Sequence, residues 1–270
     1  EWQGFGLNAD AFHGARALAA AWFRGAPVET IDAPAEEALV TADGVLGLSS
    51  LAARCATTLD QLRAAAPDRL MMAAGTCACE LAPVAWLNER YSGDLTVLWL
   101  DGHADLNTPG SSPSGHFHGM VLRSLLGEGP TAITSQMPQP LTVEQIALVG
   151  ARDLDPDETR FVREAGVVHF GLEAFTSPAL TTWLERSGRR RLYVHFDVDV
   201  IDGADFDGAL MTPPPDGPAL ADVAALIGTL CDRFDVVGLS VLEVCDRGDA
   251  IARLAATLPQ HLKPGNRDGR

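Results

Sequence analysis

Apolar residues recur along the chain with two different spacings. Short apolar runs such as Leu95–Leu100 and Ile146–Val149 have the length of buried strands, whereas residues 11–24 and 219–234 repeat apolar positions at helical spacing. The pattern predicts strands at residues 70–74, 95–100, 146–149, 167–170, 192–196 and 236–242, and helices at residues 11–24, 51–66, 80–91, 118–126, 156–165, around Trp183 and at 219–234.

Strands that are apolar on both faces and alternate with helices indicate a parallel sheet covered on both sides and joined by right-handed crossovers. We therefore expect an α/β protein with a three-layer α/β/α sandwich. The chain has 270 residues, of which 47% are hydrophobic, so it can bury one large core. Residues 1–270 are predicted to form a single domain.

The charge balance narrows the possible partners. Thirty-six acidic and 20 basic residues give a formal net charge of -16, which disfavours nucleic acid and anionic membranes and suits an enzyme acting on small molecules. The five cysteines are not spaced as a disulfide framework. The first residues contain no basic segment followed by an apolar one, and no uninterrupted apolar stretch of about 18 residues occurs. We expect a cytoplasmic protein.

Carboxylates and imidazoles follow two of the predicted strands. Asp101, His103 and Asp105 alternate after the first, and Asp197 and Asp199 alternate after the second. An extended backbone would turn each set to one side. In open α/β sheets the binding crevice lies beyond the carboxyl ends of the strands, and Cys77, Arg152, Asp153 and Glu243 also follow predicted strands.

This donor set predicts a metal site. Aspartate-rich sites suit Mn²⁺ better than Zn²⁺, and four aspartates with a histidine are enough to hold two ions that activate water for hydrolysis. The alternative is structural: Asp101 and Asp197 would be helix caps or turn residues, and His103 a surface residue.

Three motifs resemble signatures of the ureohydrolase family, which includes arginase and agmatinase. They are D-G-H-A-D-L-N-T-P at 101–109, S-G-H-F-H-G at 114–119 and F-D-V-D-V-I-D at 196–202. The resemblance implies a mostly parallel sheet of about eight strands, two Mn²⁺ per chain, and hydrolysis of a guanidino group to urea or a urea-like product. It also makes a homo-oligomer possible.

The resemblance implies metal ligands residue by residue. Asp101 and Asp197 would bridge the ions, and His103 and Asp199 would complete one of them. Asp105 would help to complete the other ion and would also hydrogen-bond the hydroxide.

Two further residues take catalytic roles by the same resemblance. His118 would shuttle protons, which suits the near-neutral pKa of imidazole, and Glu243 would pair with the substrate guanidinium. The alternatives are a residue at a helix start for His118 and a structural salt bridge for Glu243.

The segment G-A-R-D-L-D-P at 150–156 is similar to the arginase segment that recognises the α-amino group, which makes Asp155 the candidate for that contact. Asn107 and Ser114 would receive the α-carboxylate, and His116 and Thr212 complete the expected substrate site. The alternative for Asp155 is a helix N-cap preceding Pro156.

The sequence departs from the family pattern at two positions. The family's first metal ligand is the histidine of a G-G-D-H motif, but the corresponding stretch at 73–80 reads A-A-G-T-C-A-C-E and places Cys77 there. A thiolate is softer than imidazole and must lose a proton to bind, so its ion should be held more weakly. Cys77 could instead be a small buried residue, and Cys79 could compete with it. His116 replaces the asparagine that arginases commonly carry.

These departures favour a specialised relative. The chain resembles the Nω-hydroxy-L-arginine amidinohydrolases of D-cycloserine biosynthesis, which implies hydrolysis of that guanidino amino acid to hydroxyurea and L-ornithine. The alternatives are an arginase acting on L-arginine and a catalytically weak, ureohydrolase-like binding protein. A metal-dependent phosphatase is disfavoured because the sequence has no phosphate-binding glycine loop or basic cluster at the site.

Overall fold

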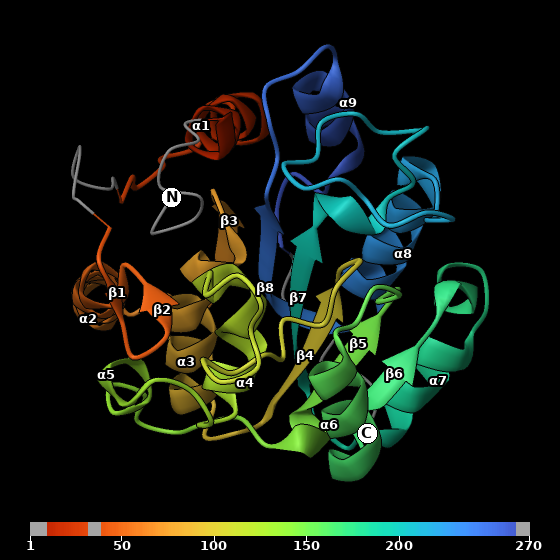
Figure 1. Ribbon diagram of the computed structural model, residues 1–270. Helices are drawn as coiled ribbons and strands as arrows, with labels where there is room; N and C mark the ends of the chain where they lie inside the picture. Colours follow the sequence, from red (N-terminus) through yellow and green to blue (C-terminus); the bar gives the residue numbers. More distant parts are fainter. Residues whose placement is uncertain (1–9, 32–38, 263–270) are drawn as a thin grey trace.

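The computed structural model describes residues 10–31 and 39–262, which are built around a parallel six-stranded sheet (Figure 1). The strand order is β3-β8-β7-β4-β5-β6, and every neighbouring pair is parallel. The strands are β3 (Leu70–Ala73), β4 (Leu95–Leu100), β5 (Ile146–Val149), β6 (Val168–Phe170), β7 (Arg191–Asp197) and β8 (Asp235–Leu242).

The described sheet has six strands, fewer than the approximately eight expected, and the described residues before β3 form two helices and a separate hairpin. That hairpin pairs β1 (Thr41–Ala42) with β2 (Val45–Leu46) in antiparallel register. The predicted parallel α/β architecture is confirmed.

Successive side chains of a strand point to opposite faces of the sheet, and they form two apolar cores, one on each face. On β4, Val97 and Trp99 pack into one core, whereas Leu98 and Leu100 pack into the other. The first core is covered by α2 (Leu48–Ala65), α3 (Leu81–Arg90), α4 (Val121–Leu125), α5 (Thr131–Thr134) and α6 (Pro156–Ala165), and the second by α1 (Asp10–Trp22), α7 (Ala179–Arg186), α8 (Leu220–Arg233) and α9 (Ala250–Thr257) (Figure 1). The predicted three-layer sandwich is thus confirmed.

Short 3-10 turns connect several of these elements. The helix expected at 118–126 is divided into a 3-10 turn and α4, and α5 and α9 were not predicted. Four residues, as in α5, are too few to show a helical period. The 3-10 turns are η1 (Cys77–Glu80), η2 (Phe117–Met120), η3 (Val143–Gln145), η4 (Leu172–Phe175) and η5 (Val198–Val200).

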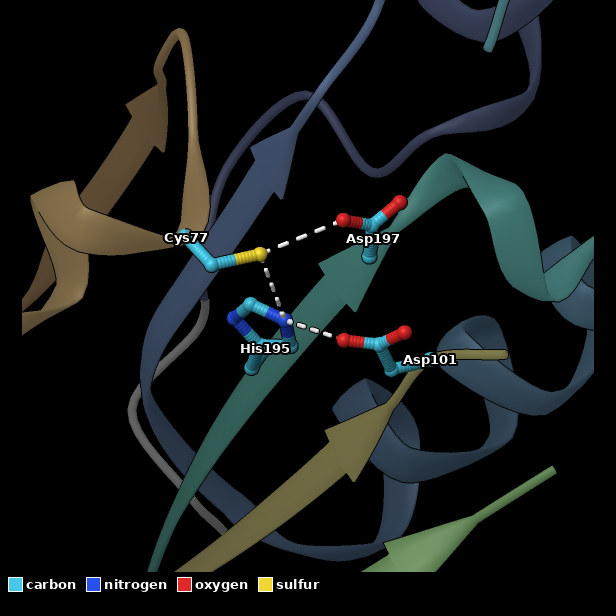
Figure 2. A group of neighbouring side chains, drawn as sticks. All are labelled: Cys77, Asp101, His195 and Asp197. Atoms are coloured by element: carbon cyan, nitrogen blue, oxygen red, sulfur yellow. Dashed lines mark hydrogen bonds and ion pairs between the residues drawn. The ribbon is translucent and has the colours of Figure 1, made fainter. Parts of the chain in front are cut away.

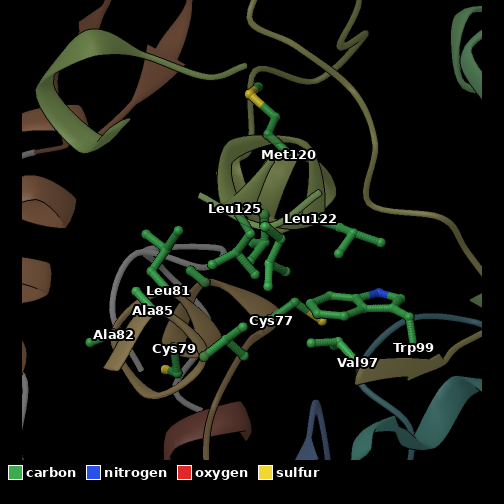
Figure 3. Close-up of a cluster of buried hydrophobic side chains, with 14 of the residues drawn as sticks. Cys77, Cys79, Leu81, Ala82, Ala85, Val97, Trp99, Met120, Leu122 and Leu125 are labelled. Atoms are coloured by element: carbon green, nitrogen blue, oxygen red, sulfur yellow. The ribbon is translucent and has the colours of Figure 1, made fainter. Parts of the chain in front are cut away.

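The first core extends to the carboxyl end of the sheet, where η1 meets β4. Figure 3 shows Cys77 lying toward Trp99, whereas Cys79 lies beside Ala82 within the apolar cluster. All five cysteines are free thiols. Within the two described ranges, no helix has both the length and the hydropathy needed to cross a bilayer.

Candidate metal centre

The carboxyl ends of β4 and β7 bring two aspartates together. Leu100 pairs in register with Phe196, so Asp101, just after β4, and Asp197, the last residue of β7, lie at the same level of adjacent strands. Both side chains are almost completely buried. Both aspartates therefore lie at the carboxyl ends of the strands, where the binding crevice was expected.

The predicted reason for the convergence of Asp101, His103 and Asp105 is wrong. Strand β4 ends at Leu100, the backbone amide of His103 donates to Oδ1 of Asp101 at 2.7 Å, and Asp105 has a left-handed backbone with φ of 52°. A turn, rather than an extended strand, sets these side chains.

The same correction applies to the second aspartate pair. Asp199 lies on η5 rather than on β7, and its backbone amide donates to Oδ1 of Asp197 at 2.8 Å. Asp197 therefore caps the turn, which was the structural alternative for this residue. Its other oxygen, Oδ2, faces Cys77.

One group of three potential ligands comprises Asp101, His103 and Asp199. Nδ1 of His103 lies 2.9 Å from Oδ2 of Asp199 and 3.6 Å from Oδ1 of Asp101. The backbone amide of Gly102 donates to Oδ1 of Asp199 at 2.9 Å, which fixes that carboxylate.

A second group comprises Cys77, Asp101, His195 and Asp197 (Figure 2). Sγ of Cys77 lies 3.2 Å from Oδ2 of Asp197 and 3.8 Å from Nε2 of His195. Nε2 of His195 lies 3.5 Å from Oδ2 of Asp101. Asp101 belongs to both groups, whereas Asp197, the other aspartate expected to bridge two ions, belongs only to the second.

His195 was missed by the sequence analysis. It lies on β7, is fully buried, and alternates with Tyr193 and Asp197 on the same face of the strand. The motif H-F-D-V-D at 195–199 could have identified it, because a residue two positions before Asp197 lies on the same face of the strand.

Asp105 and Glu243 belong to neither group but lie close by with unsatisfied oxygens. Both have left-handed backbones, with φ of 52° and 57°, although neither is a glycine. Among the described residues, Oδ2 of Asp105 and Oε2 of Glu243 are buried without a hydrogen-bond partner. Strained backbones of this kind concentrate at functional sites.

Burial of these carboxylates shifts their pKa values. Burial and the neighbouring Asp101 and Glu243 raise the pKa of Asp105 well above its usual value. Burial and the carboxylate of Asp101 raise the pKa of Asp199 to about 6. For Asp101, burial is outweighed by hydrogen bonds from His103 and His195, so that its pKa is lowered.

Two divalent cations fit this arrangement. They would neutralise carboxylates that cannot all be ionised together, and they would bind the unpartnered Oδ2 of Asp105. The carboxylate and imidazole donors suit a borderline or hard divalent metal, and one thiol adds a softer donor.

Burial also raises the pKa of the Cys77 thiol well above its usual value, as do the charges of Asp105 and Glu243. Without a cation Cys77 is therefore a thiol, and its S–H donates a hydrogen bond to Asp197. Cys79 belongs to neither ligand group and packs in the apolar core.

His118 and Glu243 form an ion pair beside the two groups of potential metal ligands. Nδ1 of His118 lies 3.3 Å from Oε1 of Glu243, which also accepts from the backbone amide of Cys77 at 3.3 Å. Burial lowers the pKa of His118, but the charge and hydrogen bond of Glu243 outweigh it, and the net pKa is raised. Oε2 of Glu243 has no hydrogen-bond partner among the described residues.

Two of the expected substrate-binding residues contact each other. Nδ2 of Asn107 donates to Oδ2 of Asp155 at 2.8 Å. Asp155 caps α6 through a capping box with Glu158, and Pro156 follows at the first helical position. The N-cap interpretation of Asp155 is confirmed, and it leaves the carboxylate facing Asn107.

The remaining expected residues lie on loops around this centre. Ser114 is exposed and accepts from the backbone amide of His116 at 3.2 Å, and the ring of His116 lies 6.0 Å from that of His118. Thr212 is exposed in the loop whose Pro214 lies against Gly102. Arg152 holds this loop by donating to the carbonyl of Pro214 at 2.6 Å.

Comparisons with known proteins place these features in a family context. The sequence model of the arginase family matches residues 31–262. The chain is 35% identical to an arginase of Entamoeba histolytica over 131 residues, which cover 47% of this chain and 44% of that protein. The chain thus spans about half the length of the curated relatives it matches.

Solved structures share the fold over most of the chain. The crystal structure of Entamoeba histolytica arginase in complex with L-ornithine superposes with a TM-score of 0.84 and 22% identity, covering 95% of each chain. A proclavaminate amidino hydrolase from Streptomyces clavuligerus superposes with a TM-score of 0.58 and 25% identity, covering 78% of this chain and 67% of that one.

Proposed function

Because this chain belongs to the arginase family, we propose that it is a dinuclear metal hydrolase that cleaves the guanidino group of Nω-hydroxy-L-arginine to give hydroxyurea and L-ornithine. The observation that carries the proposal is the buried cluster of Asp101, Asp197 and Asp199 with imidazole and thiol donors. A cluster of this composition is costly to bury unless cations occupy it.

Mn²⁺ is the proposed metal. Asp101, His103 and Asp199 would hold one ion, and Asp101, Asp197 and Cys77 would contribute to the other. When bound, the ions lower the pKa of water and so supply hydroxide as the nucleophile at neutral pH.

Glu243 would orient the substrate. Its Oε1 contacts the backbone amide of Cys77 and the ring of His118, while Oε2 is buried without a hydrogen-bond partner among the described residues. A guanidino group donates to such a carboxylate through a charge-assisted hydrogen bond, which fixes the central carbon for attack.

His118 would move the proton to the leaving amine. Its Nδ1 is held by Glu243, and its side chain is only partly exposed. An imidazole with a raised pKa holds a proton near neutral pH and can donate it to the nitrogen of L-ornithine as the C–N bond breaks.

An amino-acid substrate is supported by the polar pair of Asn107 and Asp155. Asp155 presents a carboxylate suited to an α-ammonium group, and Asn107 has an amide suited to an α-carboxylate. The structural relative from Entamoeba histolytica contains L-ornithine, the amino-acid product proposed here.

The choice of the N-hydroxylated substrate rests on Cys77. An N-hydroxyguanidine is less basic than a guanidinium and carries an extra oxygen near the metals, so it needs less electrophilic activation. A thiolate in place of an imidazole makes its ion a weaker Lewis acid, which suits such a substrate.

L-Arginine is the second candidate, because the curated relatives are named arginases. Steady-state kinetics on both substrates with Mn²⁺ separate the two. We expect a higher kcat/KM for Nω-hydroxy-L-arginine, with hydroxyurea and L-ornithine formed in equal amounts. A kcat/KM for L-arginine equal to or above that value would refute the proposed substrate.

A catalytically weak binding protein is the third candidate, since the first family histidine is replaced. Metal analysis of the reconstituted protein addresses it. We expect about two Mn²⁺ per chain, and a content below about one per chain would favour the binding protein.

A further inference from the structure

The imidazole of His195 lies between two residues of one 3-10 turn. Sγ of Cys77 is 3.8 Å from its Nε2, and a carboxylate oxygen of Glu80 is 3.0 Å from its Nδ1. Three residues complete one turn of a 3-10 helix, so residues at positions i and i+3 of η1 share a face. The C-A-C-E segment thus positions both edges of the ring.

Glu80 determines which nitrogen of His195 is available. An ionised carboxylate only accepts hydrogen bonds, so Nδ1 carries the proton that it donates to Glu80. When Nε2 gives up the proton that it otherwise donates toward Asp101, the ring is neutral and Nε2 offers its lone pair to a cation between Cys77 and Asp101. Histidine ligands of metals are commonly oriented by such a carboxylate.

The carboxylate of Glu80 is held in place by hydrogen bonds from other side chains and is shielded from solvent. The hydroxyls of Tyr193 and Ser240 both donate to its carboxylate, and its side chain is fully buried. His195 and Ser240 are in register on β7 and β8, and Tyr193 lies two residues before His195. The carboxylate therefore cannot turn away from the ring without losing these donors.

One face of the His195 ring packs against Trp99. The two rings stack with centroids 3.5 Å apart and an interplanar angle of 6°. The indole nitrogen also donates to Oδ2 of Asp101 at 3.1 Å, which points that oxygen toward the same space. His195 therefore has a single orientation, with Nε2 among the ligand atoms in Figure 2.

We propose that His195 is a metal ligand through Nε2, bound to the ion shared with Asp101 and Asp197, and that Glu80 is its positioning residue. This inference rests on the proposed function for the presence of the ion. It replaces the imidazole that is missing at position 77, on η1, by that of a residue on strand β7. The ion at this site then keeps one nitrogen donor whether or not Cys77 binds it.

The experiment compares Mn²⁺ binding by the full chain and three variants. His195→Asn places an amide near Nδ1, so it can still donate to Glu80 but has no atom at Nε2. Glu80→Gln removes the charge but keeps a side chain of the same size. His13→Asn, on the exposed side of α1, is the matched control.

We expect the unaltered chain and His13→Asn to bind two Mn²⁺ by calorimetry. His195→Asn should retain one ion and bind the other at least about 100-fold more weakly, and Glu80→Gln should weaken the same ion by about 10-fold to 100-fold. Two ions bound by His195→Asn with unchanged affinity would overturn the inference and leave the proposed function standing. Absence of Mn²⁺ binding by the unaltered chain would overturn both.

The main readout of a second measurement uses the unaltered chain and needs no variant. In the unaltered chain labelled with ¹⁵N-histidine, addition of diamagnetic Zn²⁺ should shift the Nε2 resonance of His195 while Nδ1 remains protonated. Glu80→Gln should redistribute the proton between the two nitrogens, which a purely structural role for Glu80 would not do. An Nε2 resonance unchanged by saturating Zn²⁺ would show that His195 is only a buried core residue.

Discussion

Cys77 and His195 lie against each other across the candidate metal centre, with Sγ of Cys77 3.8 Å from Nε2 of His195. Both side chains are buried, and Sγ is also 3.2 Å from Asp197. The two positions therefore share one space, and a larger side chain at one requires a smaller one at the other.

This shared space predicts strong coupling between the two residues. Cys77→His adds a second ring against His195 and should cost about 1–3 kcal/mol of unfolding free energy. Cys77→His combined with His195→Ser should recover much of that loss, because serine vacates the space. A double-mutant cycle measured by denaturant unfolding would show the coupling. Additive effects, or a fully stable Cys77→His single variant that binds two Mn²⁺, would contradict it.

The buried carboxylates predict an unusual pH dependence for the metal-free protein. Burial and Asp101 raise the pKa of folded Asp199 to about 6, above the value of about 3.9 in an unfolded chain. Its contribution to stability is therefore full below about pH 4 and is lost as the pH rises through about 6. Asp197, with a pKa raised by burial and by Asp199, acts in the same direction.

Thermal unfolding of the chelator-treated protein should thus show a Tm that falls between about pH 4 and pH 6. Saturating Mn²⁺ should reduce this fall, because the cations favour ionised carboxylates. Asp199→Asn provides the control, since it removes the titrating group and should flatten part of the fall. A metal-free Tm that rises across this interval would be inconsistent with the raised pKa values.

Asp155 combines a structural and a proposed recognition role that two substitutions separate. Asparagine is as good an N-cap as aspartate, so Asp155→Asn should leave the Tm nearly unchanged, whereas Asp155→Ala should cost about 1 kcal/mol. If Asp155 receives the α-ammonium group, both variants should raise KM. An unchanged KM in Asp155→Asn would leave Asp155 as a helix cap alone.

His118 is predicted to matter for the chemical step but not for metal binding. His118→Asn can keep the contact with Glu243 while removing the titratable ring. We expect kcat to fall by about 100-fold or more with an unchanged Mn²⁺ content. His169, an exposed histidine that contacts the carbonyl of Ala151 at 2.8 Å, gives the comparison variant His169→Asn. A His118→Asn variant within threefold of the unaltered kcat would exclude a proton-transfer role.

Local patterns were sufficient to predict the secondary structure that positions the site. The apolar run Leu95–Leu100 and the segment Pro156–Ala165 were predicted with the bounds they have in the structure, because burial on both faces and a capped amphipathic helix leave direct periodic signals. The position of Asp101 and Asp197 at the carboxyl ends of the strands followed from the parallel topology alone.

The conformations after the strands were not predictable in this way. Asp105 and Glu243 adopt left-handed backbones, and Asp199 lies on a 3-10 turn, although alternation suggested extended chain. Such conformations are imposed by contacts from other segments, for example by the hydrogen bond from the amide of Glu243 to the carbonyl of Gly75.

The sequence by itself determined the alternation of strands and helices, the acidic donor set and the absence of a histidine at Cys77. Only the tertiary structure decided that His195 faces that same space and that Glu80 orients it. The physical reason is distance along the chain: these contacts join η1 to β7 across more than one hundred residues, and no local period reports which side chains meet when separate strands pair.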